Sequence, residues 1–401
     1  MIADSWQFIL VFIAIAIGWL LGRGSRVSDV GDNAPLHREY YKGLNYLLND
    51  QPDNALDSFI TSLEVNSETL ETHIAVGNLM RRKGEVDRAI RIHQNLLSRP
   101  SLPRVHLHKA HLELARDFIS AGLLDRAERL LKDLIEEAPE LREISLRLLL
   151  EIYQDEKEWV EAIGVARQLL PRRSLLKAAS PADKSVVLAL SHYCCELAKR
   201  ALDKDEYQVA RTHVKKALSY DRNCVRASLL SADIEFQVGH YNWAIKSLRK
   251  VRYQDPAFIP ETMELLNASY EQLDQIDEYY RYLIETLDYS QSVSSLLSVV
   301  ENISRTQGDT AAGEFLGQQL TRSPSLRGLA KLVELYIANS DGGSKDNLNV
   351  LQLLIEQLMR SKPQYQCHHC GFSGKRLHWL CPSCKQWGQI KAIRGAEGER
   401  L

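Results

Sequence analysis

The chain has 401 residues, of which 45% are hydrophobic and 25% are charged, and its formal net charge at pH 7 is −2. A chain this close to neutrality offers no overall electrostatic attraction for nucleic acid. Its length would suit two or three ordinary domains, but the sequence patterns described below indicate one long repeat with a small module at each end.

The first feature in chain order is an uncharged apolar stretch, Trp6–Leu21. Together with the apolar residues in front of it, the stretch approaches the ~20 residues that an α-helix needs to cross a bilayer. A cleaved signal peptide would carry positive charge before the stretch, whereas here Asp4 precedes it and Arg23 follows. This charge order favours an uncleaved anchor with the remaining chain in the cytoplasm. We therefore predict a transmembrane helix over residues 1–22 and a juxtamembrane linker over 23–35.

The middle of the chain repeats. Alanine recurs at spacings of 34, 38, 35, 48 and 34 residues, and a small residue lies twelve positions before most of these alanines. The pattern resembles the tetratricopeptide repeat, in which small side chains let two helices approach closely and neighbouring units stack into a solenoid. It predicts an all-α right-handed superhelix over residues 36–363, with an inner surface that binds peptides or proteins. The alanines are Ala55, Ala89, Ala127, Ala162, Ala210 and Ala244.

Later units of the repeat are weaker but can still be followed. Tyr270 and Tyr279 fit a seventh unit, Ala312 fits an eighth, and residues 329–363 fit a ninth. The 48-residue spacing is explained by an insertion around residues 171–181. Three glycines mark turns between the helices of a unit, because glycine tolerates positive φ: Gly84, Gly122 and Gly239.

Two Cys-x2-Cys pairs lie near the C-terminus, separated by ten residues. Each such pair turns two thiolates toward one point, and two pairs complete a tetrahedral metal site that suits iron or zinc. Residues 364–395 are too few to bury a core without a metal or disulfides, and residues 396–401 form a tail. Disulfides would require an oxidising compartment, which the predicted cytoplasmic location argues against. The predicted ligands are Cys367, Cys370, Cys381 and Cys384.

Other polar clusters are interpreted as structural. His368 and His369 are expected at the surface of the module, and His111 is expected in the repeat core. The basic stretch near Arg172 reads as a solvated loop, with acidic lipid headgroups or a regulatory partner as the alternative. The sequence contains no Gly-x-Ser-x-Gly, His-Glu-x-x-His or phosphate loop, so no catalytic residues are predicted. Small packing residues are expected at Cys194, Cys195 and Cys224.

The C-terminal module leaves three functions open. Its Cys-x2-Cys-Gly turn is similar to the knuckles of rubredoxin, an electron carrier, although Lys385 stands where the second glycine would be. Basic residues interleaved with Trp379 and Trp387 are also typical of zinc ribbons that bind nucleic acid. We favour a structural site, in which the tryptophans supply the module's own apolar surface and the charges point outward. The module is then expected to form a cap at the far end of the solenoid.

The combined order of anchor, repeats and cysteine module resembles the lipopolysaccharide assembly protein B family over essentially the entire chain. The resemblance implies a non-enzymatic, single-pass inner-membrane adaptor with most of its chain in the cytoplasm. It also implies that the adaptor promotes degradation of the LpxC deacetylase by the membrane protease FtsH, and that an inner-membrane protein that senses lipopolysaccharide antagonises it. Further candidate partners are lipopolysaccharide, its assembly machinery and a second copy of the chain, but not nucleic acid. The resemblance also implies that the rubredoxin-like module packs against the repeats.

Overall fold

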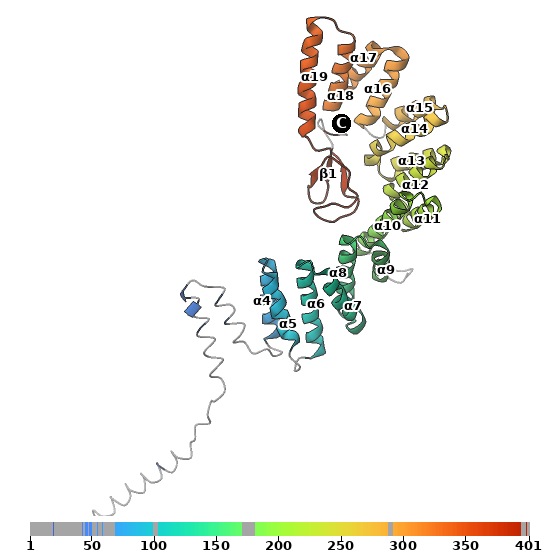
Figure 1. Ribbon diagram of the computed structural model, residues 1–401. Helices are drawn as coiled ribbons and strands as arrows, with labels where there is room; N and C mark the ends of the chain where they lie inside the picture. The colour runs from blue at the N-terminus through green and yellow to red at the C-terminus, as the bar shows by residue number, and fades with distance from the viewer. Residues whose placement is uncertain are drawn as a thin grey trace, which may run out of the picture. The chain divides into compact units, whose positions relative to one another are not determined.

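The computed structural model describes residues 69–98, 103–170, 181–287 and 292–393, together with a few single positions. The chain divides into two compact units, Met1–Ser145 and Leu146–Leu401, and each is described by itself. Figure 1 shows successive antiparallel helices in both. The first unit contains α4 (Leu70–Arg82), α5 (Val86–Leu97), α6 (Arg104–Ser120) and α7 (Leu124–Glu137).

The second unit continues the same helical pattern and ends in a small sheet. The boundary between the units falls within α8 (Arg142–Asp155). Two short 3-10 turns, η1 (Pro256–Phe258) and η2 (Pro260–Thr262), precede α14. The remaining helices are α9 (Trp159–Leu169), α10 (Pro181–Leu202), α11 (Tyr207–Tyr220), α12 (Val225–Gln237), α13 (Tyr241–Gln254), α14 (Met263–Gln272), α15 (Ile276–Leu287), α16 (Val293–Gln307), α17 (Asp309–Arg322), α18 (Leu326–Ala338) and α19 (Gly343–Ser361).

The alanine spacing corresponds to one position of the helix pairs. Ala89, Ala127, Ala162, Ala210 and Ala244 each occupy the fourth position of the second helix of a pair, and none has exposed surface. Tyr279 and Ala312 take this position in α15 and α17 and are also buried. The described residues thus form eight helix pairs, from α4/α5 to α18/α19. Ala55, the predicted first repeat and most of the 171–181 insertion lie outside the described residues.

The turns between paired helices share a left-handed residue. Gly84, Gly122 and Gly239 have φ of 84°, 72° and 84°, as their position in the sequence predicts. Three non-glycine residues adopt the same conformation in the α8/α9, α10/α11 and α14/α15 turns, with φ between 55° and 60°. This backbone conformation costs a residue with a Cβ roughly 1 kcal/mol or more. The packing of the two helices must therefore impose it. The three residues are Lys157, Asp205 and Asp274.

A buried polar network joins the helices of the first unit. His93 on α5 and Asp117 on α6 are both fully buried, and Nδ1 of His93 lies 2.5 Å from Oδ2 of Asp117. Arg81 on α4 donates to the other oxygen of Asp117 at 2.6 Å and also pairs with Glu113 at 2.7 Å. Gly77 leaves room for the imidazole, because a Cβ at this position would lie 2.4 Å from Nε2 of His93.

The predicted membrane anchor lies almost entirely outside the described residues. Trp19 is the single position of the anchor that the structure describes. Among the residues that the structure describes, no helix is both long and apolar enough to span a membrane. The anchor over residues 1–22 and the linker over 23–35 therefore remain predictions.

Candidate metal centre and its docking surface

A small antiparallel sheet carries the cysteine module. Strand β1 (Tyr365–Cys367) pairs with β2 (Ser373–Gly374) on one side and with β3 (Ile390–Ala392) on the other, in the order β2-β1-β3. Cys367 ends β1, opposite Ile390. Cys367, Cys381 and Ile390 form the small buried cluster of the module.

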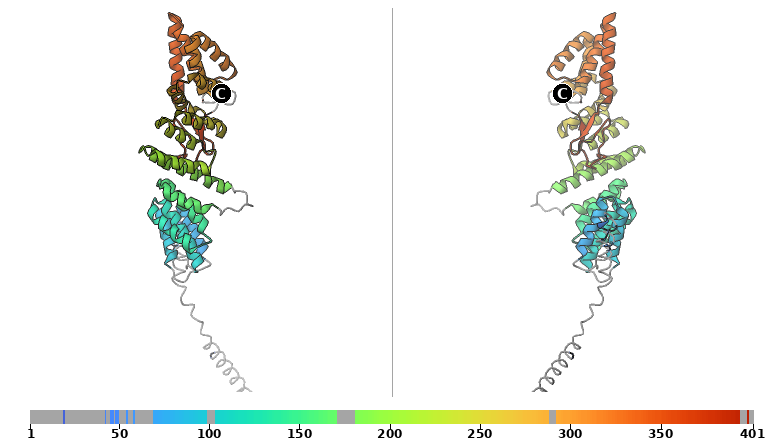
Figure 2. Two further views of the ribbon diagram at one scale, coloured as in Figure 1. Left: turned by 90° about the vertical axis from the view of Figure 1, so that its right-hand side faces the viewer. Right: turned by 90° about the vertical axis from the view of Figure 1, so that its left-hand side faces the viewer.

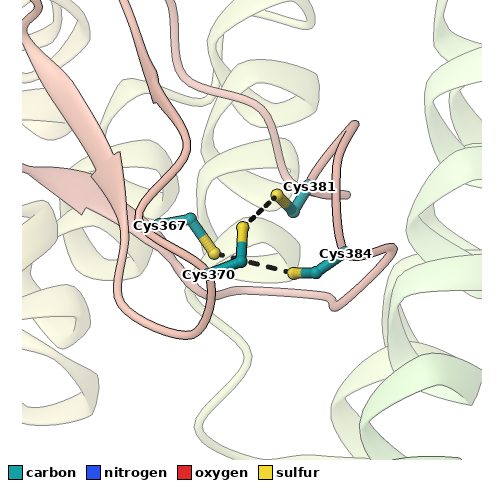
Figure 3. Close-up of side chains that lie close together, drawn as sticks. All are labelled: Cys367, Cys370, Cys381 and Cys384. Atoms are coloured by element: carbon teal, nitrogen blue, oxygen red, sulfur yellow. Dashed lines mark hydrogen bonds between the residues drawn. The ribbon is translucent and has the colours of Figure 1, made fainter.

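The four predicted ligand residues converge, as Figure 3 shows. Their Sγ atoms all lie within 4.8 Å of one another. The Sγ atoms of Cys367 and Cys384 are 3.8 Å apart, and those of Cys370 and Cys381 are 3.7 Å apart. A tetrahedral ion with metal–sulfur bonds of about 2.3 Å would place its sulfurs about 3.8 Å apart. The thiol sulfurs therefore fit a tetrahedral zinc or iron ion.

The two Cys-x2-Cys turns have the same backbone geometry. In the first, the N–H of Gly371 donates to the carbonyl of Cys367 at 3.0 Å, and in the second, the N–H of Lys385 donates to the carbonyl of Cys381 at 3.0 Å. Gly371 has φ of 79° and Lys385 has φ of 57°. Lys385 therefore adopts the conformation of the glycine that it replaces, and this departure from the rubredoxin sequence leaves the turn intact.

Two of the four thiols have pKa values shifted in opposite directions. The backbone N–H of Phe372 lowers the pKa of Cys370 to about 6, because a hydrogen bond to the thiolate stabilises the charged form. Desolvation and hydrogen bonds with the neighbouring thiols raise the pKa of Cys384 to about 12, although the backbone N–H of Gln386 acts in the opposite direction. Four thiolates this close together repel one another, so ionising all of them requires a positive ion between them.

Trp387 attaches the module to α8, α9 and α10. It is 5% exposed, and its indole N–H donates to Oε1 of Gln154 at 2.8 Å. Its ring stacks on His192 with centroids 4.8 Å apart and planes inclined by 15°. Trp159 and Tyr193 contact it edge-on at 6.1 and 5.9 Å. The tryptophan therefore packs into the repeats, whereas the sequence led us to place it in a core of the module itself.

A second aromatic contact involves Trp379 and the residues after α13. The ring of Trp379 stacks on Phe258 of η1 with centroids 5.3 Å apart. The guanidinium of Arg226 on α12 lies 5.9 Å from the Trp379 ring and 6.0 Å from the Trp387 ring. Arg226 is only 8% exposed and pairs with Glu196 at 2.8 Å. One buried cation thus lies against both tryptophans.

Polar contacts surround the aromatic docking residues. Lys385 pairs with Asp155 at 2.7 Å and Lys391 pairs with Asp255 at 2.5 Å. The hydroxyl of Tyr365 donates to Glu261 at 2.7 Å. The side chains of Lys385 and Lys391 point outward from the module, as expected. They form ion pairs with acidic residues of the repeats.

These contacts correct the predicted position of the module. Its partners lie on α8, α10, α12, η1 and η2 rather than at the last helices of the solenoid. The chain therefore returns from the end of α19 to its own earlier repeats. The expectation of a terminal cap was wrong, and the packing implied by the family resemblance is confirmed.

The docked module forms one wall of a cavity of about 700 Å³. Leu377 and Trp379 contribute the module's side, while Leu229 and Leu265 contribute apolar surface from α12 and α14. Charged residues from the same helices surround this surface, among them Glu264. An apolar cavity with a few charged groups at its edge suits a peptide or another small ligand segment.

Other residues singled out in the sequence take structural positions. His368 and His369 are exposed, and His111 is half-buried, with burial lowering its pKa. Among the described residues, the four cysteines are the one group arranged to hold a metal. Arg172 and its basic neighbours lie outside the described residues. The expected packing cysteines are all buried: Cys194, Cys195 and Cys224.

Sequence reasoning missed the docking residues. Gln154, His192 and Arg226 lie in ordinary repeat helices, at positions that the repeat pattern does not distinguish from core or surface. Nothing in the sequence marks these three residues, because the burial of His192 and Arg226 becomes visible only in the structure.

Comparisons with known proteins agree with this architecture. Residues 365–392 match a family model described as a rubredoxin metal-binding domain. The chain is 37% identical over 393 residues to lipopolysaccharide assembly protein B of Escherichia coli K12, and the match covers 98% of both chains. The chain belongs to the lipopolysaccharide assembly protein B family. The Haemophilus influenzae member is 36% identical over 400 residues, covering 97% of this chain and 98% of that protein.

Solved structures supply a more distant comparison for this chain. A tetratricopeptide-repeat protein of Parabacteroides merdae covers 67% of this chain and 99% of its own, with 14% identity and a TM-score of 0.33. The family assignment rests on the full-length relatives and on the repeat and cysteine geometry described above.

Proposed function

We propose that this chain is a non-catalytic adaptor that regulates lipopolysaccharide synthesis. In this proposal, residues 1–22 anchor it in the inner membrane, residues 23–35 link the anchor to about nine repeats in the cytoplasm over 36–363, and residues 364–395 form the metal module. The adaptor brings the LpxC deacetylase to the membrane protease FtsH, and an inner-membrane protein that senses lipopolysaccharide opposes it. Full-length relatives named for lipopolysaccharide assembly support this role.

The observation that carries the proposal is the cavity between the metal module and the repeats. Its volume of about 700 Å³ and its apolar residues Leu229, Leu265 and Trp379 suit a client segment rather than a small polar substrate. An anchored adaptor needs only a moderate affinity for its client. Holding both proteins at one membrane raises their effective concentration, to roughly the millimolar range for short linkers.

The metal supports binding indirectly. We propose that Cys367, Cys370, Cys381 and Cys384 hold one iron or zinc ion, which would act as a cross-link that keeps the module folded. The residues of the module then position Leu377 and Trp379 in the cavity wall. Metal analysis of the purified chain separates the two ions, because a rubredoxin-type iron centre is coloured and a zinc centre is colourless.

A substitution in the cavity tests the adaptor role. Ala268 lines the cavity from α14, so Ala268→Arg introduces a long charged side chain there without removing a large core group. In cells that depend on this variant, we expect the half-life of the deacetylase to lengthen several-fold. The purified variant should bind the deacetylase at least 10-fold more weakly than the wild-type chain does.

Ile284→Arg provides the control, because Ile284 is 56% exposed on α15 and does not line the cavity. The control should leave both the half-life and the binding unchanged. If depletion of the whole protein left the deacetylase half-life unchanged, the adaptor proposal would be refuted. If Ala268→Arg behaved like Ile284→Arg, the cavity would not be the client site.

A further inference from the structure

The last helix of the second unit, α19, carries a set of exposed apolar side chains. It lies at the end of the unit in Figures 1 and 2, and it packs on α18. Single exposed apolar residues are normal, but a contiguous set on one element marks an interaction surface. The exposed residues are Val350, Leu351, Leu353, Leu354 and Leu358, with 58, 41, 66, 53 and 53% of their surface accessible.

Helical geometry groups these residues on one side of α19. At about 100° per residue, Val350, Leu351, Leu354 and Leu358 fall within an arc of roughly 100°. Ile355, which is 3% exposed, lies beyond one edge of this arc. The exposed set is therefore distinct from the side of the helix that packs in the repeat core.

A row at heptad spacing runs along the opposite edge of the arc. Asp346, Leu353 and Arg360 are each seven residues apart, so they lie almost in line on the helix surface. Leu353 belongs to the apolar set and lies near the middle of the stretch from Val350 to Leu358. An acidic residue thus lies two turns before the centre of the row, and a basic residue lies two turns after it.

We propose that α19 pairs antiparallel with α19 of a second copy of this chain, about a twofold axis close to Leu353. The twofold places each Asp346 opposite Arg360 of the other copy and brings the two apolar arcs together. An isologous contact of this kind requires a surface that complements its own reversed copy. The row Asp346, Leu353, Arg360 meets this requirement, whereas a parallel pair would place like charges side by side.

The charges are accessible for such a contact. Asp346 is exposed, and Arg360 has 83% of its side chain accessible, with Glu356 at 3.8 Å as its one ion-pair partner among the described residues. A helix of 19 residues is about 28 Å long, so the contact is smaller than the roughly 1,200–2,000 Å² buried in most stable complexes. We therefore expect a dimer with a dissociation constant of about 1–10 µM.

Sedimentation of the full-length chain, kept in detergent, over about 0.5–100 µM tests the dimer. The wild-type chain should pass from monomer to dimer within this range, and Leu354→Glu should remain monomeric at the highest concentration. Circular dichroism and metal content confirm that the variant is folded. The proposal is overturned if the wild-type chain stays monomeric at 100 µM or if Leu354→Glu dimerises as the wild type does.

A charge exchange tests the antiparallel arrangement. Asp346→Arg and Arg360→Asp should each weaken self-association at least 10-fold, because each places like charges opposite one another at both ends. An equimolar mixture of the two variants restores opposite charges at both ends, so differently tagged chains should copurify. Asp341→Arg, the same substitution at an exposed residue before α19, should leave self-association unchanged. If the mixture associates no better than either variant alone, the antiparallel pair is wrong.

Discussion

Replacing Trp387 by alanine should detach the metal module from the repeats. The side chain is 5% exposed and contacts His192, Trp159 and Tyr193. Removing a buried tryptophan typically costs about 3–5 kcal/mol. No buried acceptor is abandoned, since Gln154 Oε1 still accepts from the Tyr193 hydroxyl at 3.1 Å. The loss should therefore stay within that range.

Urea unfolding of the full-length chain, followed by tryptophan fluorescence, measures this loss. With a slope of about 3 kcal/mol per molar urea, the transition that involves the module should fall by roughly 1–2 M. Trp243→Ala is the matched control, because Trp243 is 60% exposed and its contact with Lys246 (5.0 Å from Nζ to the ring centroid) is worth no more than about 1 kcal/mol. A shift for Trp387→Ala no larger than that of the control would refute this account of docking.

Three further predictions concern stability and the metal. Gly77→Ala should lower the melting temperature, because a Cβ 2.4 Å from the fixed His93 ring costs about 1–3 kcal/mol; Gly164→Ala, with open space around it, should raise it. Burial, then the charge of Arg226, lowers the pKa of His192 to about 3, so the unfolded chain alone binds this proton between pH 3 and 6.5. The free energy of unfolding should thus fall by about 2 kcal/mol from pH 7 to pH 5. In His192→Phe this part of the pH dependence, measured by urea titration, should disappear. If the free energy of unfolding of His192→Phe changed with pH as that of the wild type does, His192 would not be the titrating group. Cys370→Ser should leave less than one equivalent of metal after dialysis while the repeat helicity persists; full retention would exclude this ligand.

The repeat was predictable because it has a local, periodic cause. Alanine occupies the close-approach position in most of the helix pairs, although Tyr279 takes it in α15, and its spacing therefore records those pairs directly. The turns at Lys157 and Asp205 were not predictable in the same way. Their left-handed backbone is imposed by the surrounding helices, and neither residue has the preference for that conformation that glycine has. The sequence indicates a turn reliably only where the residue itself favours one.

The cysteine geometry was predictable, but the place where the module docks was not. Four thiols in two short turns form a site from local sequence alone. In contrast, Trp387 meets Gln154 across more than 200 residues of sequence, and such a contact leaves no periodic trace. The same distance explains the incorrect cap: position in the chain suggested the end of the solenoid, whereas aromatic and charged partners lie in its earlier repeats.

Metal binding contributes more free energy to the module than docking on the repeats does. A structural metal contributes roughly 10–16 kcal/mol to a small module of this kind, whereas the docking tryptophan contributes about 3–5 kcal/mol. Loss of the ion therefore unfolds the module and removes Leu377 and Trp379 from the cavity. Loss of docking moves the same wall but leaves the metal bound. Metal occupancy in the proposed adaptor thus controls whether the cavity is complete, and docking in turn favours the metal-bound module by the same coupling free energy.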